Sequence, residues 1–321
     1  GDHLTFLDFS ENPKSSGLKK IKGLECINTT NIIDMSEMFA YCKDLKELDL
    51  SNFNTNNVTT MYGMFRGCHS MIDLDISSFN TSNVTDMRYM FDSFGNSATQ
   101  LDISNFDISK VEQFNGMFDS CGLKNIDLSN FKFTTFKGKS FGKMFTDCPN
   151  LETLDLSNFY VEGEPFSTHF SGCTSLKTVN LPKNFNENYL GGNHILSGTC
   201  NECSSLEEFN LNKGNDFVEQ YPSTPYMTFY KCVSIKYIDI SSVDTQGFFD
   251  RTFSHCENLE SIIFSKDSTC DGGASTFNNC KKLNYIKCSQ AMKDAMIENQ
   301  NAMGLPNSMR EGGSGTWEII N

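Results

Sequence analysis

The fold is decided by a repeated stretch, Asn80-Thr81-Ser82-Asn83-Val84-Thr85-Asp86-Met87-Arg88-Tyr89-Met90-Phe91. A near-copy begins 26 residues upstream at Asn54, and another begins 26 residues before that at Asn28. A fixed period of roughly 20–50 residues is typical of solenoids, in which similar coils stack on one another. The sequence therefore predicts a stack of coils in which one continuous core runs along the repeats.

Each copy leads into a second recurring phrase, of which Leu48-Asp49-Leu50-Ser51-Asn52-Phe53 is one instance. An aromatic residue stands three positions before a cysteine between the two phrases, as at Phe65 and Cys68. A Leu-x-x-Leu-x-Leu pattern then follows, and its alternation of apolar and polar residues has the period of a half-buried strand.

The first phrase has apolar residues at roughly helical spacing, for example Val58, Met61 and Met64. This part is short, so one helical or 3₁₀ turn is expected in place of a long helix. Each coil should therefore contribute one short strand and one such turn. The predicted fold class is an α/β repeat solenoid with a parallel sheet on one face.

The regular pattern sets the expected domain organisation. Residues 1–27 are expected to form an N-terminal cap of degenerate coils, and residues 28–288 about ten repeats. Insertions fall near 184–197 and 213–226; they could carry specificity at one edge of the solenoid or be tolerated surface length. Residues 289–321 are expected to form a C-terminal cap, with a short helix after Ser289 as N-cap and an edge strand at Trp317–Ile320.

The formal net charge of −14 excludes some partners. Binding to nucleic acid or to anionic lipid requires Lys and Arg, so neither partner is expected. A basic partner is compatible with the charge, although solubility also explains it. No apolar run approaches the roughly 20 residues that cross a bilayer, and the N-terminus carries no secretion signal. The chain is therefore either cytosolic or trimmed of a signal, and an initial Gly without Met favours trimming.

Repetition converts one position of the repeat into a column of side chains about 4.8 Å apart where strands pair. The first column is made of cysteines: Cys42, Cys68, Cys121, Cys148, Cys173, Cys203, Cys232, Cys256 and Cys280. A metal site needs thiolates that converge on one point, and parallel side chains seldom reach the dihedral angle of a disulfide. We therefore expect free, buried cysteines that pack as small apolar residues, and no cofactor. Cys200-x-x-Cys203 is a weak redox motif.

A second column is acidic and is predicted to face outward, because each member stands between two inward-facing apolar residues. Its members are Asp49, Asp75, Asp102, Asp127, Asp155 and Asp239. Stacked carboxylates repel one another, and either solvent or a bound cation such as calcium would reduce this cost. No Asp-rich calcium loop is present, so a solvated acidic face available to a partner is preferred.

A neighbouring outward column turns from acidic to aromatic towards the C-terminus, where Tyr237 and Tyr285 stand. Exposed tyrosine is a favoured contact residue in protein interfaces. We predict these two tyrosines as anchors for a partner on the sheet face, with ordinary cross-strand packing as the alternative.

The phrases Asn-Thr-Ser-Asn-Val-Thr-Asp-Met-x-x-Met-Phe, Phe-x-x-Cys-x-x-Leu and Leu-Asp-Leu-Ser-Asn-Phe closely resemble the BspA-like leucine-rich repeats, of the variety abundant in surface proteins of mycoplasma and of gut and oral bacteria. The resemblance covers about Asn28–Cys288 and is strongest through Phe159. It implies a leucine-rich-repeat solenoid, export to the cell surface, and adhesion or protein binding. The resemblance does not name a ligand; a protein ligand is expected, for which a host extracellular or surface protein is one candidate.

Catalysis finds no support in the sequence. The five histidines share no spacing and no recurrent acidic partner, and no phosphate-cradling glycine loop occurs. The preferred hypothesis is a non-enzymatic bacterial cell-surface module that binds protein through a rigid repeat face. A structural scaffold without surface exposure is the alternative, and an export signal in the full gene would separate the two.

Overall fold

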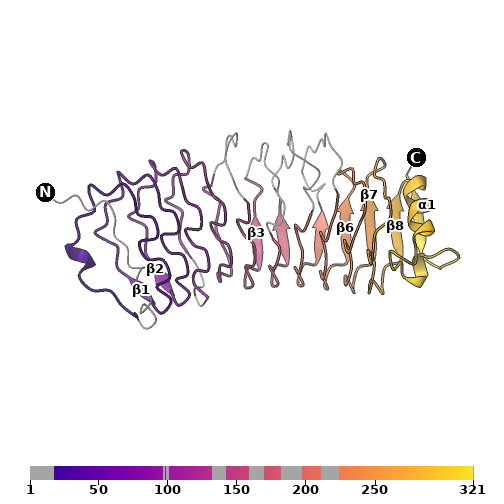
Figure 1. The fold of residues 1–321 in the computed structure, drawn as a ribbon, viewed down its shortest axis with the longest axis horizontal. Coiled ribbons are helices and arrows are strands. Elements are labelled where there is room, and N and C mark those ends of the chain that lie inside the picture. The colour runs from indigo at the N-terminus through magenta and orange to yellow at the C-terminus, as the bar shows by residue number, and fades with distance from the viewer. Residues whose placement is uncertain are drawn as a thin grey trace. The chain divides into compact units, whose positions relative to one another are not determined.

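The computed structural model describes residues 18–96, 98, 101–131, 142–158, 170–181, 197–210 and 224–320. The chain divides into two compact units, Gly1–Phe159 and Tyr160–Asn321. Within each unit successive coils lie side by side as in a parallel β-solenoid with little helix (Figure 1). The predicted fold class is confirmed. Most of the expected N-terminal cap and of the two insertions lies outside the described residues, and the bounds of the domains remain predictions.

The first unit has very short regular elements: the 3₁₀ helix η1 (Leu24–Cys26) and the strands β1 (Glu47–Leu48), β2 (Asp73–Leu74) and β3 (Thr153–Asp155). Strand β1 pairs in parallel with β2, with Leu48 opposite Leu74. A second parallel ladder of single bridges joins Asp34 to Thr60, Thr60 to Asp86 and Asp86 to Gln113. Equivalent positions of successive repeats therefore lie opposite one another.

The second unit contains β4 (Thr178–Asn180), β5 (Glu208–Asn210), β6 (Tyr237–Ile240), β7 (Ser261–Phe264), β8 (Tyr285–Cys288), α1 (Gln290–Glu298), the 3₁₀ helix η2 (Asn307–Met309) and β9 (Thr316–Ile319). Strands β5 to β9 form one parallel sheet in chain order. Helix α1 begins as predicted, because Ser289 Oγ accepts a hydrogen bond from Met292 N at 3.3 Å. Trp317 lies in the edge strand β9, also as predicted.

The methionine-rich part of each coil forms tight turns instead of the expected helical turn. Glu37 and Tyr41 have left-handed backbone angles, with φ of 55° and 59°. Left-handed residues cannot continue a right-handed helix. The chain therefore alternates local bonds, such as Ala40 N to Glu37 O at 2.9 Å, with bonds to the next coil, such as Phe39 N to Met64 O at 3.0 Å.

Aligned aromatic rings form the centre of the core. In the first unit Phe39, Phe65, Phe91, Phe118 and Phe145 stack in succession, with ring centroids 5.6–5.8 Å apart and interplanar angles of 4–10°. All five are buried. Phe229, Phe253 and Phe277 form an equivalent stack in the second unit. Phenylalanines that recur every 24–27 residues in the sequence are thus aligned in the structure.

The cysteine column is buried and its thiols are free, as predicted. Each thiol for which a contact is resolved also donates a hydrogen bond to a backbone carbonyl of the preceding coil. Examples are Cys68 Sγ to Phe39 O at 3.2 Å and Cys256 Sγ to Phe229 O at 3.0 Å. Cysteine therefore fills a small site and satisfies a buried carbonyl at once.

Candidate partner-binding site

Each predicted outward aspartate closes a local turn. Asp49 Oδ1 accepts hydrogen bonds from Ser51 N at 3.1 Å and from Ser51 Oγ at 2.7 Å. Five further pairs repeat the backbone bond at 2.8–3.0 Å: Asp75–Ser77, Asp102–Ser104, Asp127–Ser129, Asp155–Ser157 and Asp239–Ser241. We name these six elements the Asp-x-Ser turns. Asp239 is half-buried, and the other five aspartates are exposed.

These turns determine the charge of the acidic column. Hydrogen bonds from the serine hydroxyl and backbone stabilise the ionised form and lower the pKa of Asp49, Asp75 and Asp102. The backbone N–H of Ser129 has the largest part in lowering the pKa of Asp127. Repulsion between neighbouring aspartates acts in the opposite direction but is the smaller effect. The column is therefore acidic, with one oxygen of each carboxylate already engaged.

Tyr237 and Tyr285 lie in one outward column of the five-stranded sheet. Tyr237 is opposite Ser261, and Ser261 is opposite Tyr285, so one strand separates the two tyrosines. Neighbouring strands are about 4.8 Å apart, which places their Cα atoms about 10 Å from one another. Both side chains are half-buried. The structure thus brings the two predicted anchors onto one face of the second unit.

Hydrogen bonds hold both rings in place. Tyr237 Oη donates to Asp239 Oδ2 at 3.2 Å, and Tyr285 Oη donates to Glu318 Oε2 at 2.5 Å. The bond to Glu318 is the main reason that the pKa of Tyr285 rises to about 12. Burial, followed by the charge of Asp239, raises the pKa of Tyr237. Both phenols are therefore neutral at physiological pH and fixed in orientation.

Glu318 is a site residue that the repeat pattern did not predict. It lies opposite Lys287 in the pairing of β8 with β9, and Lys287 Nζ is 2.7 Å from Glu318 Oε1. The edge strand at Trp317–Ile320 was expected, but its register was not. Setting this strand in register with the last repeat would have placed Glu318 beside Lys287 and Tyr285.

A second unpredicted feature is a ladder of tyrosines and arginines on the turns of the first unit. The Arg66 guanidinium lies over the rings of Tyr41 and Tyr89, 5.6 Å and 5.1 Å from their centroids. Arg66 Nε also donates to Asp92 Oδ2 at 2.7 Å. Arg88 lies over Tyr62 at 5.2 Å. These residues stand beside the recurring Met-Phe pair in sequence, but only the left-handed turns bring them together.

The weak redox motif lies in the core. Cys200 and Cys203 are both buried, and burial raises the pKa of both thiols. Thiols of raised pKa carry little thiolate, which is the reactive form. Among the residues that the structure describes, no group of three or more His, Cys, Asp or Glu side chains is arranged to hold a metal ion.

Two stacks of short parallel strands with a buried aromatic and cysteine column define a leucine-rich-repeat solenoid. The chain belongs to the family described as "Mycoplasma protein of unknown function, DUF285", which matches residues 9–131 and 94–184. Residues 191–300 match the family described as "BspA type Leucine rich repeat region (6 copies)". The resemblance to BspA-like repeats is therefore confirmed.

Three solved structures are similar to the chain. A leucine-rich repeat protein from Bacteroides ovatus is 18% identical, with a TM-score of 0.39, over 89% of this chain and 80% of that one. A leucine rich cell surface protein from Faecalibacterium prausnitzii is 16% identical, with a TM-score of 0.35, over 84% and 78%. A leucine-rich repeat protein from Eubacterium ventriosum is 16% identical, with a TM-score of 0.36, over 90% and 88%. No curated protein matches the chain. Within the described part of the chain, no helix combines the length and apolarity that crossing a membrane requires.

Proposed function

We propose that this protein is a non-enzymatic, protein-binding module of a bacterial cell surface, and that the outward face of the β5–β9 sheet contacts the partner. The BspA-type repeats support a role in protein interaction. The proposed partner is a host extracellular or surface protein. Export to the cell surface is part of the proposal and follows from the family resemblance.

One observation carries the choice of face. Two rows of side chains cross the strands in register: Tyr237, Ser261, Tyr285 and Thr316, and beside them Asp239, Ile263, Lys287 and Glu318. The rows combine aromatic, apolar and charged groups. Tyrosine is enriched among the residues that dominate binding energy in protein interfaces.

The hydrogen-bonded rings also reduce the entropic cost of binding. Ordering a rotamer-rich side chain at an interface costs about 0.5–1.5 kcal/mol. Tyr285 is already held by Glu318, which Lys287 holds in turn. Strand backbones on either side are paired across four strand interfaces. A partner therefore meets a surface that is largely preformed.

The test is binding to immobilised extracellular-matrix and host-surface proteins, measured with the wild type and with a Tyr237→Ala, Tyr285→Ala double variant. Loss of two interface anchors should weaken binding at least about tenfold, since such residues contribute about 2 kcal/mol or more each. Tyr226→Ala is the matched control, because Tyr226 is a 46% exposed tyrosine in the same unit but outside the strands.

Two other outcomes of this test would contradict different parts of the proposal. Equal weakening by Tyr226→Ala and by the double variant would contradict the choice of the sheet face. Failure to bind any surface or matrix protein, together with absence of the protein from the cell surface in fractionation, would favour the structural scaffold.

A further inference from the structure

A cleft at the C-terminal end of the second unit is lined by residues of α1, of the loop at 310–315 and of β9. Its volume of about 650 Å³ falls within the roughly 300–1,000 Å³ of small-molecule sites. Trp317 lines it, whereas Glu318, the next residue, contacts Tyr285 on the outward sheet face. Successive strand residues point to opposite sides, so the cleft is separate from the proposed protein-binding face.

The ring of Trp317 gives the cleft an aromatic surface. Trp317 is half-buried, and Lys293 Nζ lies 5.7 Å from the centroid of its ring. Lys293 and Ile297 are four residues apart on α1 and so share one side of the helix. Ile297 also lines the cleft and extends its apolar surface.

Hydrogen bonds fix the loop at 310–315, which forms the wall of the cleft opposite α1. Gly315 N donates to Ser308 O at 2.7 Å, and a Cβ atom at Gly315 would overlap Met309 Sδ. Arg310 Nε donates to Leu305 O at 2.7 Å, and its Nη1 to Asn301 Oδ1 at 3.1 Å. The Nη2 group has no acceptor among the residues that the structure describes. Arg310 therefore offers an oriented donor that needs no rearrangement to bind a ligand.

The charges around the cleft select the class of ligand. Two cations, Lys293 and Arg310, face three carboxylates, those of Asp294, Glu298 and Glu311. Among the residues that the structure describes, the carboxylates of Glu298 and Glu311 accept no hydrogen bond and form no ion pair. These carboxylates would repel an anionic ligand, and the lysine and the arginine would repel a cationic one. A hydroxyl group both donates and accepts hydrogen bonds, so a polyhydroxyl compound satisfies both sets.

We propose that this cleft binds a neutral saccharide, with a sugar ring against the face of Trp317 and hydroxyl groups between Arg310 and the carboxylates of Glu298 and Glu311. The apolar C–H face of a sugar ring suits an aromatic surface, and its hydroxyl rim suits the mixed charges. The site goes beyond the proposed protein binding and does not depend on it.

Trp317 is the only tryptophan in the chain, so its emission reports directly on the cleft. The probes are methyl glucoside, methyl galactoside and N-acetylglucosamine, with glucuronate and glucosamine as charged relatives. At least one neutral probe should change the emission saturably and bind more tightly than both charged sugars. Absence of a saturable change with every neutral probe, or tighter binding of either charged sugar, would overturn the proposal.

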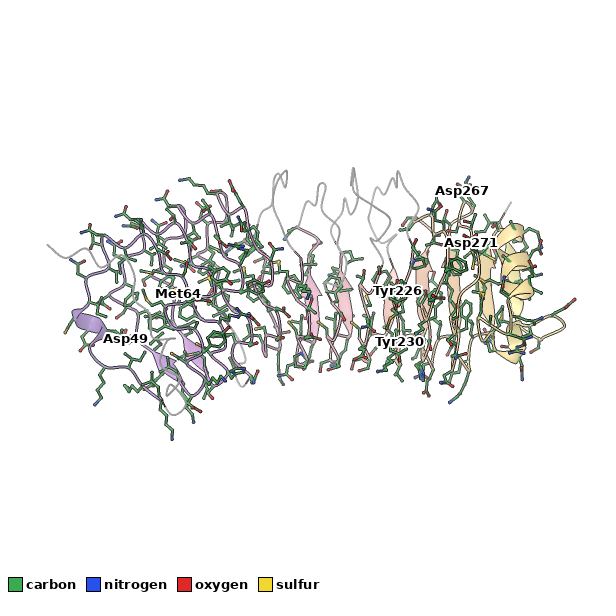
Figure 2. The ribbon with its side chains drawn as sticks, in the orientation of Figure 1. Asp49, Met64, Tyr226, Tyr230, Asp267 and Asp271 are labelled. Carbon is green, nitrogen blue, oxygen red and sulfur yellow. The ribbon has the colours of Figure 1, made fainter. Side chains whose placement is uncertain are left out.

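A Glu298→Gln, Glu311→Gln double variant tests the hydrogen-bonding residues. Both side chains are exposed, so circular dichroism should show an unchanged fold. Loss of two charged acceptors should weaken binding of the neutral probe about tenfold or more. Tyr226→Phe is the control, because Tyr226 is an exposed tyrosine of the same unit that does not line the cleft, and Figure 2 shows it away from helix α1; this change should leave the affinity unchanged. Unaltered affinity in the double variant would contradict the assigned hydrogen bonds.

Discussion

Leu154 and Asp155 are neighbours on β3 that face opposite sides of the strand, so substituting each with alanine tests the assigned faces. Leu154 is 3% exposed, whereas Asp155 is exposed. Leu154→Ala removes three carbon groups at about 0.8 kcal/mol each, or roughly 2.4 kcal/mol. A partly collapsed cavity adds about 1 kcal/mol. The expected loss in the free energy of unfolding is therefore about 3–4 kcal/mol.

Asp155→Ala should cost clearly less, because the Asp155 side chain is exposed and its bond from Ser157 N, at 2.8 Å, lies at the surface. Urea unfolding followed by far-ultraviolet circular dichroism measures both values. The slope of the free energy of unfolding against urea concentration should be the same in the wild type and the variants. Differences in the urea midpoint then report differences in stability. Thr153→Ala, a second exposed position on β3, is the control. Equal losses for Leu154→Ala and Asp155→Ala would show that the faces of the strand are reversed.

Three further predictions concern thiols, pH and backbone. Cys26 is the only exposed cysteine of thirteen, so a thiol reagent should modify one cysteine rapidly in the native protein and the others only in urea; several fast thiols would contradict the buried column. Folding lowers the pKa of Asp49, Asp75, Asp102 and Asp127, so their Asp-x-Ser turns stabilise the protein above the ordinary aspartate pKa of about 3.9 and lose this contribution as pH falls through the folded value. The urea midpoint should fall over that range, and less steeply in a Ser51→Ala, Ser77→Ala variant; identical pH profiles would refute the assignment. Gly116 has a φ of +61° and lies against the ring of Tyr89, so Gly116→Ala should lower the melting temperature more than Gly312→Ala, where φ is also positive but nothing lies within 4 Å of the added carbon.

The periodic parts of the fold could be predicted because one local pattern is copied many times. Each repeat position was expected to form a column, and Cys68 and its equivalents to be buried; the aligned rings of Phe65, Phe118 and Phe145 follow from the same repeat. The form of the turns was not predicted, because Glu37 and Tyr41 have left-handed backbone angles. Such angles are usually signalled in a sequence by glycine, and neither residue is glycine. A signal was present: the column Glu37, Gly63, Tyr89 and Gly116 contains glycine twice, and glycine favours a positive φ.

The candidate site was predictable only where it follows the repeat. The outward positions of Asp49 and Tyr237 follow from strand alternation. The Leu-Asp-Leu-Ser phrase also contained a signal for the Asp-x-Ser turns, because aspartate side chains often accept a hydrogen bond from the backbone N–H two residues later. The contact of Tyr285 with Glu318 could not be predicted, because it joins the last repeat to a strand that is not part of the pattern.

The central claim is that coils repeating about every 26 residues stack in register, and deleting one coil tests it most directly. Removing residues 54–79 joins Phe53 to Asn80, which restores the local sequence of the repeat and keeps the columns aligned. This variant should fold cooperatively, with circular dichroism per residue like that of the full chain. Removing residues 54–66, half a coil, would place strand positions against turn positions and should destroy cooperative unfolding of the first unit. If the half-coil deletion folds as well as the whole-coil deletion, or if neither folds, the register of the coils does not hold the structure together.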